Sequence, residues 1–116
     1  MKFLMTYEQN PDLPPPTPQK MAEIGAYTRR NIEAGIVLMT GGLVRPTRGI
    51  KMRCEDGKVS ITDGPFAESK ELIDGYALIQ ADSREHAIAI ATEFMQLAGD
   101  GNGEILQVYD PPGMPG

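Results

Sequence analysis

The amino-acid sequence predicts an α+β fold in which two helices pack on one sheet. Three observations support this prediction. Segments with helical periodicity alternate with short apolar segments, capping residues bound each helical segment, and a two-residue turn joins the clearest pair of strands. The chain has 116 residues, of which 41% are hydrophobic and 23% charged, as expected for one globular domain. We place this domain at residues 1–109 and a flexible C-terminal tail at residues 110–116.

The first half of the chain predicts a strand, a helix and a second strand, over residues 2–7, 18–34 and 36–40. A proline-rich connector at residues 10–18 precedes the helix, with Thr17 as the expected N-cap and Pro18 at the first helical position. Gly35 supplies the left-handed residue that ends it. Helical spacing places one stripe on the buried side, formed by Met21, Ile24, Thr28 and Ile32.

The segment from Ile50 to Thr62 has the pattern of a β-hairpin. Asp56-Gly57 is a preferred two-residue turn, and it fixes the register of the two strands. That register puts apolar side chains on one face and polar ones on the other. The expected pairs are Cys54 with Val59 and Met52 with Ile61 on the apolar face, and Glu55 with Lys58 and Arg53 with Ser60 on the polar face.

The second half predicts a strand over residues 72–81, a helix that ends at Gly99, and a last strand over residues 104–109. Asp82 is the expected N-cap of this helix, with Glu85 as its capping-box partner. The buried stripe centres on Ala87, Ala91, Phe94 and Ala98. With the hairpin set aside, the order is βαββαβ, the split βαβ or ferredoxin-like pattern, here with an inserted β-hairpin.

The sheet is expected to need a cover that the chain does not supply. Two helices cover only one face of a four-stranded sheet, yet the predicted strands are apolar on both faces. A second copy of the chain is the simplest cover, so we expect a homodimer with the sheets packed face to face. The alternative is a monomer whose open face is partly capped by the hairpin.

Charge and motifs exclude several classes of function. Eleven Lys and Arg against sixteen Asp and Glu give a net charge of −5, which argues against direct binding to nucleic acid or to an anionic membrane. No run is apolar enough for a membrane helix and no leader pattern is present, so a cytoplasmic location is expected. The lone Cys54 and lone His86 predict no disulfide and no zinc site. No nucleotide-binding or hydrolase motif occurs, so no cofactor is expected.

The segment 63–71, DGPFAESKE, followed by Gly75-Tyr76, resembles the signature of the DGPF branch of the YCII-related family. The start KFLMTY and the Gly41-Gly42-Leu43 segment support the resemblance, which covers residues 1–109. It implies a bacterial dimeric α/β barrel of ferredoxin-like fold whose functions are mostly unassigned. It also implies a link to extracytoplasmic-function sigma factors. One departure is that His86 does not match the His–Asp pair of the YCII-type branch.

Asp63 is the candidate catalytic residue, as a general acid or base. It follows a strand and precedes Gly64-Pro65, so a turn holds its carboxylate, and partial burial in a pocket would suit it to proton transfer. The alternative is an Asx-turn, in which the carboxylate accepts backbone N–H groups and only shapes the loop.

The remaining candidates are ligand-binding residues, each with a structural alternative. The stretch 45–58 holds five basic and two acidic residues, a charge of +3, which leaves −8 on the rest of the chain. Arg45 and Arg48 would bind a small anionic molecule, or the charges would protect the hairpin edge. Phe66 would stack on a ligand or anchor its loop, Glu68 would line the pocket or face solvent, and Tyr76 would donate its hydroxyl or pack.

Two functions follow from these residues and the resemblance. The first is a dimeric small-molecule enzyme or ligand-binding protein, with a pocket between the sheet and the hairpin and Asp63 as acid or base. The second is a regulatory or interaction module associated with a sigma factor, in which the DGPF loop is structural. The sequence leaves open whether the protein is an enzyme.

Overall fold

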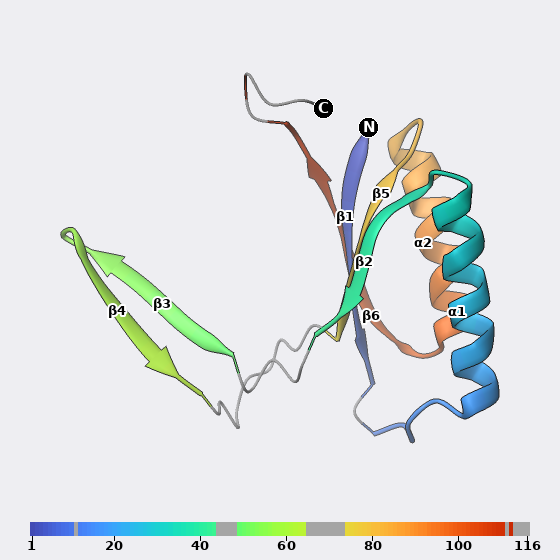
Figure 1. Cartoon of the computed structure of the whole chain (residues 1–116), viewed down its shortest axis with the longest axis horizontal. Coiled ribbons are helices and arrows are strands. Elements are labelled where there is room, and N and C mark those ends of the chain that lie inside the picture. Colours follow the sequence, from blue (N-terminus) through green and yellow to red (C-terminus); the bar gives the residue numbers. More distant parts are fainter. Residues whose placement is uncertain (11, 44–48, 65–73, 111, 113–116) are drawn as a thin grey trace.

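A computed structural model describes residues 1–10, 12–43, 49–64, 74–110 and 112, and it shows a mixed α+β fold (Figure 1). The predicted α+β class is therefore confirmed. The elements in chain order are β1 (Lys2–Gln9), α1 (Pro18–Glu33), β2 (Val37–Gly42), β3 (Ile50–Glu55), β4 (Lys58–Asp63), β5 (Gly75–Gln80), α2 (Arg84–Ala98) and β6 (Gly101–Val108).

Four of the strands form one sheet, in the order β2-β5-β1-β6. Every neighbouring pair in this sheet is antiparallel. Phe3 of β1 lies opposite Ile79 of β5, and a register shift around Leu38 interrupts the pairing of β2 with β5. Because β1 pairs with β6, the first and the last strand of the described chain are neighbours in this sheet.

Both helices cover the same face of this sheet (Figure 1). Apolar side chains of β1 and β5 form the core there with small and apolar side chains of α2, which lets the helix approach closely. The buried members are Phe3, Met5, Ile79, Ala81, Ala87, Ile90 and Ala91. In the described part of the chain, no helix is long and apolar enough to cross a bilayer.

The helix boundaries confirm most of the predicted caps and correct one. Thr17 caps α1, because its hydroxyl accepts a hydrogen bond from the Lys20 amide at 3.1 Å. Gly35 has the expected positive φ angle, 77°, and Gly99, at the end of α2, also has a positive φ angle, 103°.

The N-cap of α2 is Ser83 and not the predicted Asp82. The Ser83 hydroxyl accepts from the His86 amide at 3.0 Å, and this makes Ser83 the capping residue. The Asp82 amide instead donates to Nδ1 of His86 at 3.0 Å, and the Asp82 carboxylate points into solvent. Asp82 and Ser83 are adjacent and both have side chains that can cap a helix. The hydrogen bond from the His86 amide goes to the Ser83 hydroxyl, so Ser83 takes the capping position.

The buried face of α1 is rotated from the predicted stripe. Tyr27 is the buried residue of this helix, with Ile24 and Thr28 half-buried beside it. Met21 is 62% exposed and Ile32 50%, so the two ends of the predicted stripe face solvent. The aromatic ring of Tyr27 is large enough to set which side of the helix faces the sheet.

Strands β3 and β4 form a separate two-stranded sheet with the predicted register. All four predicted pairs, from Glu55 with Lys58 to Met52 with Ile61, are confirmed. Asp56 and Gly57 both have positive φ angles, 51° and 77°, as the tight turn requires. Cys54, on the apolar face of the hairpin, is exposed because no described part of this chain covers that face.

The face of the four-stranded sheet opposite the helices carries an apolar patch, and the same register places Lys2, Thr6, Gln80 and Glu104 around it on this face. The pairing of Leu4 with both Leu78 and Leu106 sets one row across three strands. This set, termed the open face, consists of Leu4, Met39, Tyr76, Leu78, Leu106 and Val108. Leu106 and Met39 are exposed and the others half-buried in the single chain.

The predicted tail at residues 110–116 lies mostly outside the described residues. Its first residue is held, because Lys2 Nζ and the Asp110 carboxylate form an ion pair at 3.2 Å. This contact places the end of β6 beside the start of β1.

Candidate functional site

A cavity of about 390 Å³ lies between the helices and the sheet. Its wall is mostly apolar, and every strand of the four-stranded sheet contributes to it together with both helices. Its volume falls within the range of small-molecule sites, about 300–1,000 Å³. The lining side chains that the argument uses are Tyr7, Tyr27, Thr28, Asp74, Ala91 and Phe94.

Three aromatic residues connect the elements around this cavity. The rings of Tyr7 on β1 and Phe94 on α2 meet edge to face, with centroids 5.6 Å apart. Tyr27 on α1 lies 6.5 Å from Phe94 in a tilted arrangement. Phe94 therefore joins the strand to both helices, and the ring edges give the cavity a wall suited to flat apolar molecules.

Asp74 organises one end of the cavity, where β1, β2 and β5 meet. Its carboxylate accepts a hydrogen bond from the Gln9 amide at 2.6 Å, and its own amide donates to the Tyr7 carbonyl at 2.8 Å. Its carbonyl accepts from the Leu43 amide at 2.9 Å. Asp74 is thus fixed by three separate contacts at the edge of the cavity, with its carboxylate still exposed to solvent.

Burial raises the pKa of the Tyr7 phenol above 10.0, and the nearby Asp74 and Asp100 carboxylates raise it further. The Tyr7 hydroxyl donates to the Gly99 carbonyl at 3.1 Å. Burial also raises the pKa of the Tyr27 phenol, and the charge and hydrogen bond of Glu93 act in the same direction. The Arg30 guanidinium, 5.9 Å from the Tyr27 ring centroid, lowers that pKa by a smaller amount.

We expect the Tyr7→Phe variant to lack an ionisation whose midpoint lies above pH 10.0 in the wild type. A raised folded-state pKa means that the unfolded chain loses this proton first. The free energy of unfolding should therefore fall as the pH rises above 10.0, and it should fall less in Tyr7→Phe. The measurement is the phenolate absorbance during an alkaline titration, followed by denaturation at two alkaline pH values. If the ionisation that Tyr7→Phe lacks has its midpoint at or below pH 10.0 in the wild type, the assignment is wrong.

Asp74 is the acidic side chain at the edge of the described cavity wall, and no described lining residue is a cation. Glu104 also borders the cavity, but its pairing with Thr6 turns its side chain to the open face. Such a wall suits a neutral, largely apolar ring inside the cavity, with polar atoms near Asp74 and the Tyr7 edge. Among the residues that the structure describes, no group of three or more His, Cys, Asp or Glu side chains gathers as metal ligands do.

The sequence-predicted site residues are only partly placed. Asp63 is the last residue of β4, opposite Ile50, and its side chain is exposed and does not line the cavity. Tyr76 borders the cavity, but its pairing with Thr6 places its side chain on the open face, against Gly41. Arg45, Arg48, Phe66 and Glu68 lie outside the described residues.

Two stretches outside the described residues join the sheet to the hairpin, and their described ends are paired. Leu43 and Asp74 are hydrogen-bonded at the sheet, and Gly64 donates to the Gly49 carbonyl at 3.1 Å at the hairpin. Arg45 and Arg48 belong to the first stretch, and the motif residues Phe66 and Glu68 to the second. The first stretch begins after Leu43 and the second ends before Asp74, so both adjoin the end of the cavity that Asp74 organises.

The expected pocket lay between the sheet and the hairpin, whereas the observed cavity lies between the sheet and the helices. Sequence reasoning missed Asp74, Tyr27 and Phe94 as site residues. One signal pointed to Asp74, because an acidic residue directly before a Gly-initiated strand is placed at a sheet end. The aromatic pair gave no signal beyond core packing.

The structure thus combines an α+β sheet covered on one face by two helices with a mostly apolar cavity beneath them. The YCII-related domain model matches residues 1–110. The chain is also 32% identical over 98 residues to an uncharacterized protein of Rhizobium meliloti (strain 1021), covering 82% of this chain and 79% of that protein. This chain belongs to the YCII-related family.

Proposed function

We propose that this protein binds a small molecule with an apolar ring, and that the ring occupies the cavity between the helices and the sheet. The observation that carries this proposal is the cavity of about 390 Å³ with its apolar wall and aromatic edges. The phenol of Tyr7 and the carboxylate of Asp74 supply polar groups at one end. This arrangement, few polar groups in a mainly apolar concavity, is typical of small-molecule sites.

The family branch and assembly form part of the same proposal. Segment 63–71 supports membership of the DGPF branch. The strand order β2-β5-β1-β6 with both helices on one face supports a ferredoxin-like domain. The uncovered apolar open face supports a homodimer with the sheets face to face, as in a dimeric α/β barrel.

We propose that the polar part of the ligand is bound by residues that lie next to the cavity edge in the sequence. Arg45 directly follows Leu43-Val44 and Arg48 comes three residues later, and their guanidinium groups would pair with a carboxylate on the ring. Phe66 and Glu68 belong to the stretch that ends at Asp74. Asp63, whose carboxylate is exposed at the end of β4, is the proposed proton donor or acceptor if the bound molecule is a substrate.

Benzamide and benzoate test the cavity, because they share one ring and differ in charge. We expect both to bind, and we expect Thr28→Phe to weaken binding by at least about tenfold since the new ring occupies the cavity from α1. Ala22→Phe is the matched control, because Ala22 lies on the exposed side of the same helix. Ligand-observed NMR measures the weak affinities.

Two comparisons separate the parts of this proposal. Tighter binding of benzoate than of benzamide, lost in Arg45→Ala or Arg48→Ala, would support the anion-binding role. Asp63→Asn should leave the binding of both probes unchanged, because Asp63 is not part of the cavity wall. Equal affinity for the probes in Thr28→Phe and wild type would contradict the cavity site. No binding of either probe would favour the interaction module.

A further inference from the structure

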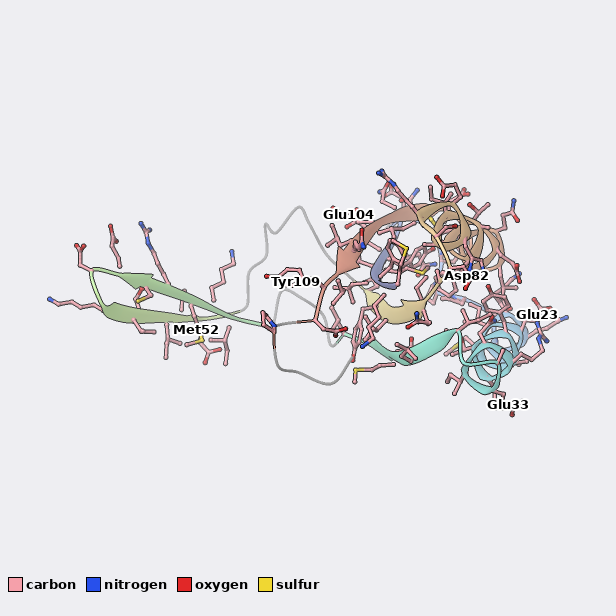
Figure 2. The ribbon with its side chains drawn as sticks, turned by 90° about the horizontal axis from the view of Figure 1, so that it is seen from above. Glu23, Glu33, Met52, Asp82, Glu104 and Tyr109 are labelled. Carbon is pink, nitrogen blue, oxygen red and sulfur yellow. The ribbon has the colours of Figure 1, made fainter. Side chains whose placement is uncertain are left out.

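The hairpin of β3 and β4 presents an apolar face that no described part of its own chain covers. Met52 is 68% exposed, and its neighbours on this face are exposed to a similar degree. The arm face, as we term it, consists of Ile50, Met52, Cys54, Val59 and Ile61. Figure 2 shows Met52 on the hairpin, far from helix α1, which carries Glu23 and Glu33.

An isolated two-stranded hairpin is at best marginally stable in water. It gains independent stability when a third strand or another element packs on its apolar face. The register confirms that Met52 and Ile61 face the same side, so a cover on that side would remove both from water. The hairpin therefore needs a partner surface that the described part of one chain does not provide.

The hairpin projects from the side of the four-stranded sheet that the helices leave free (Figure 1). The open face and the hairpin thus lie on the same side of the molecule. The radius of gyration is 16.4 Å, against about 13 Å for a compact chain of this length. A body placed against the open face would meet the hairpin as well.

The area of the open face alone is small for a stable dimer. Four strands about 4.8 Å apart and about six residues long present a flat face of about 400 Å². A stable complex commonly buries about 800 Å² on each partner. One hairpin of two such strands offers about 200 Å². In a two-fold dimer each copy buries the face of its own hairpin and also the surface on which the partner's hairpin packs, so the hairpins add about 200 Å² twice to each copy. Sheet and hairpin together reach the usual size.

The charged side chains of the hairpin lie away from its apolar side chains. In the described hairpin three basic side chains balance three acidic ones, and all but Asp63 at the base lie on the polar face or at the turn; these are Lys51, Arg53, Glu55, Asp56 and Lys58. The polar face would then point outward, and the arm face inward to the second copy.

We propose that the hairpin is an arm that clasps a second copy of this chain, with the arm face packed on that copy beside its open face. The proposal rests on the homodimer proposed above and adds the surface that completes it. Asp63 pairs with Ile50 and so lies on the same side of the hairpin, at its base. The clasp thereby moves this carboxylate from solvent to the interface between the two copies.

Cys54 lies on the arm face and is the one cysteine of the chain, so its thiol reports on the clasp. The experiment measures the mass of the native protein by light scattering and, on the same sample, the rate at which dithionitrobenzoate modifies Cys54. We expect a dimer in which Cys54 reacts at least about tenfold more slowly than in the urea-unfolded chain. That result would support the clasp.

Each other outcome overturns the clasp in a distinguishable way. A dimer whose Cys54 reacts at the unfolded rate would mean that the arms are free while the sheets still pair. A monomer with a reactive Cys54 would remove the dimer and the clasp together. A monomer with a protected Cys54 would mean that the arm folds on its own chain. Binding of benzamide is measured separately and depends on none of these results.

A matched pair of variants gives a second measurement. Ile61→Asp puts a charge on the arm face, and Ser60→Asp puts the same charge on the polar face one residue away. We expect Ile61→Asp to raise the dissociation constant and the Cys54 rate by at least about tenfold, and Ser60→Asp to change neither. Both positions are exposed in the single chain, so circular dichroism should show an unchanged fold. Equal behaviour of the two variants would overturn the clasp.

Discussion

Replacing Leu106 with aspartate should convert the protein from a dimer into a folded monomer. Leu106 is 50% exposed in the single chain, so the fold gives up little when it is replaced. In the proposed dimer the same position is covered, and two-fold symmetry places the new charge in the interface twice. We expect the dissociation constant to rise at least about a hundredfold, which corresponds to about 3 kcal/mol. Sedimentation equilibrium over a range of protein concentrations measures it.

Gln107→Asp is the control for this prediction. Gln107 is exposed on the same strand, but its pairing with Phe3 turns it to the opposite face of the sheet. The control should keep the wild-type dissociation constant, and both variants should keep the wild-type circular dichroism. Dimers of unchanged affinity in Leu106→Asp would show that the open face is not the contact surface.

Replacing Phe3 with alanine should lower the free energy of unfolding by about 4 kcal/mol, since removal of a buried aromatic ring costs about 3–5 kcal/mol. Phe3 is 2% exposed on the central strand β1, and it belongs to the core between sheet and α2. It does not line the cavity, so little space is already empty around it. Urea denaturation at one fixed protein concentration measures the change, because association also adds to stability.

Ile32→Ala serves as the comparison for Phe3→Ala. Ile32 is half exposed in the last turn of α1, and alanine is the stronger helix former there. The expected change is about 1 kcal/mol or less. Similar losses in both variants would mean that the core does not lie where β1 meets α2.

The sequence could predict those parts of the fold that local chemistry decides. The Asp56-Gly57 turn fixes a register by backbone geometry alone, and every predicted pair of the hairpin is present. Thr17 and Gly35 are similarly local, because a cap needs only its own helix. The prediction of Asp82 as the N-cap was wrong because the next residue, Ser83, has a hydroxyl that can cap the helix as well as a carboxylate can.

The rotation of α1 could not be predicted from periodicity. The spacing of apolar residues predicts that a helix has a buried face. Contacts with other elements decide which residue lies at the centre of that face. Here Tyr27 meets Phe94 of α2, and this pairing turns Met21 toward solvent. The partner of Tyr27 lies 67 residues further along the chain, beyond the reach of any local pattern.

The cavity was beyond prediction for the same reason. Its existence depends on the distance at which the helices sit from the sheet, which is a property of packing. Asp63 was chosen from a turn motif, and such a motif is local; Asp74 was overlooked because the amide it holds belongs to Gln9, 65 residues earlier. A pattern search finds the first kind of residue and misses the second.

The central place of β1 has a consequence for synthesis of the chain. β1 is made well before its neighbours β5 and β6, which begin only at Gly75 and Gly101. On the ribosome its apolar residues must wait without a partner until most of the protein has emerged. Contacts between such distant segments slow folding, so this sheet should close late, in one step that needs the C-terminal strand.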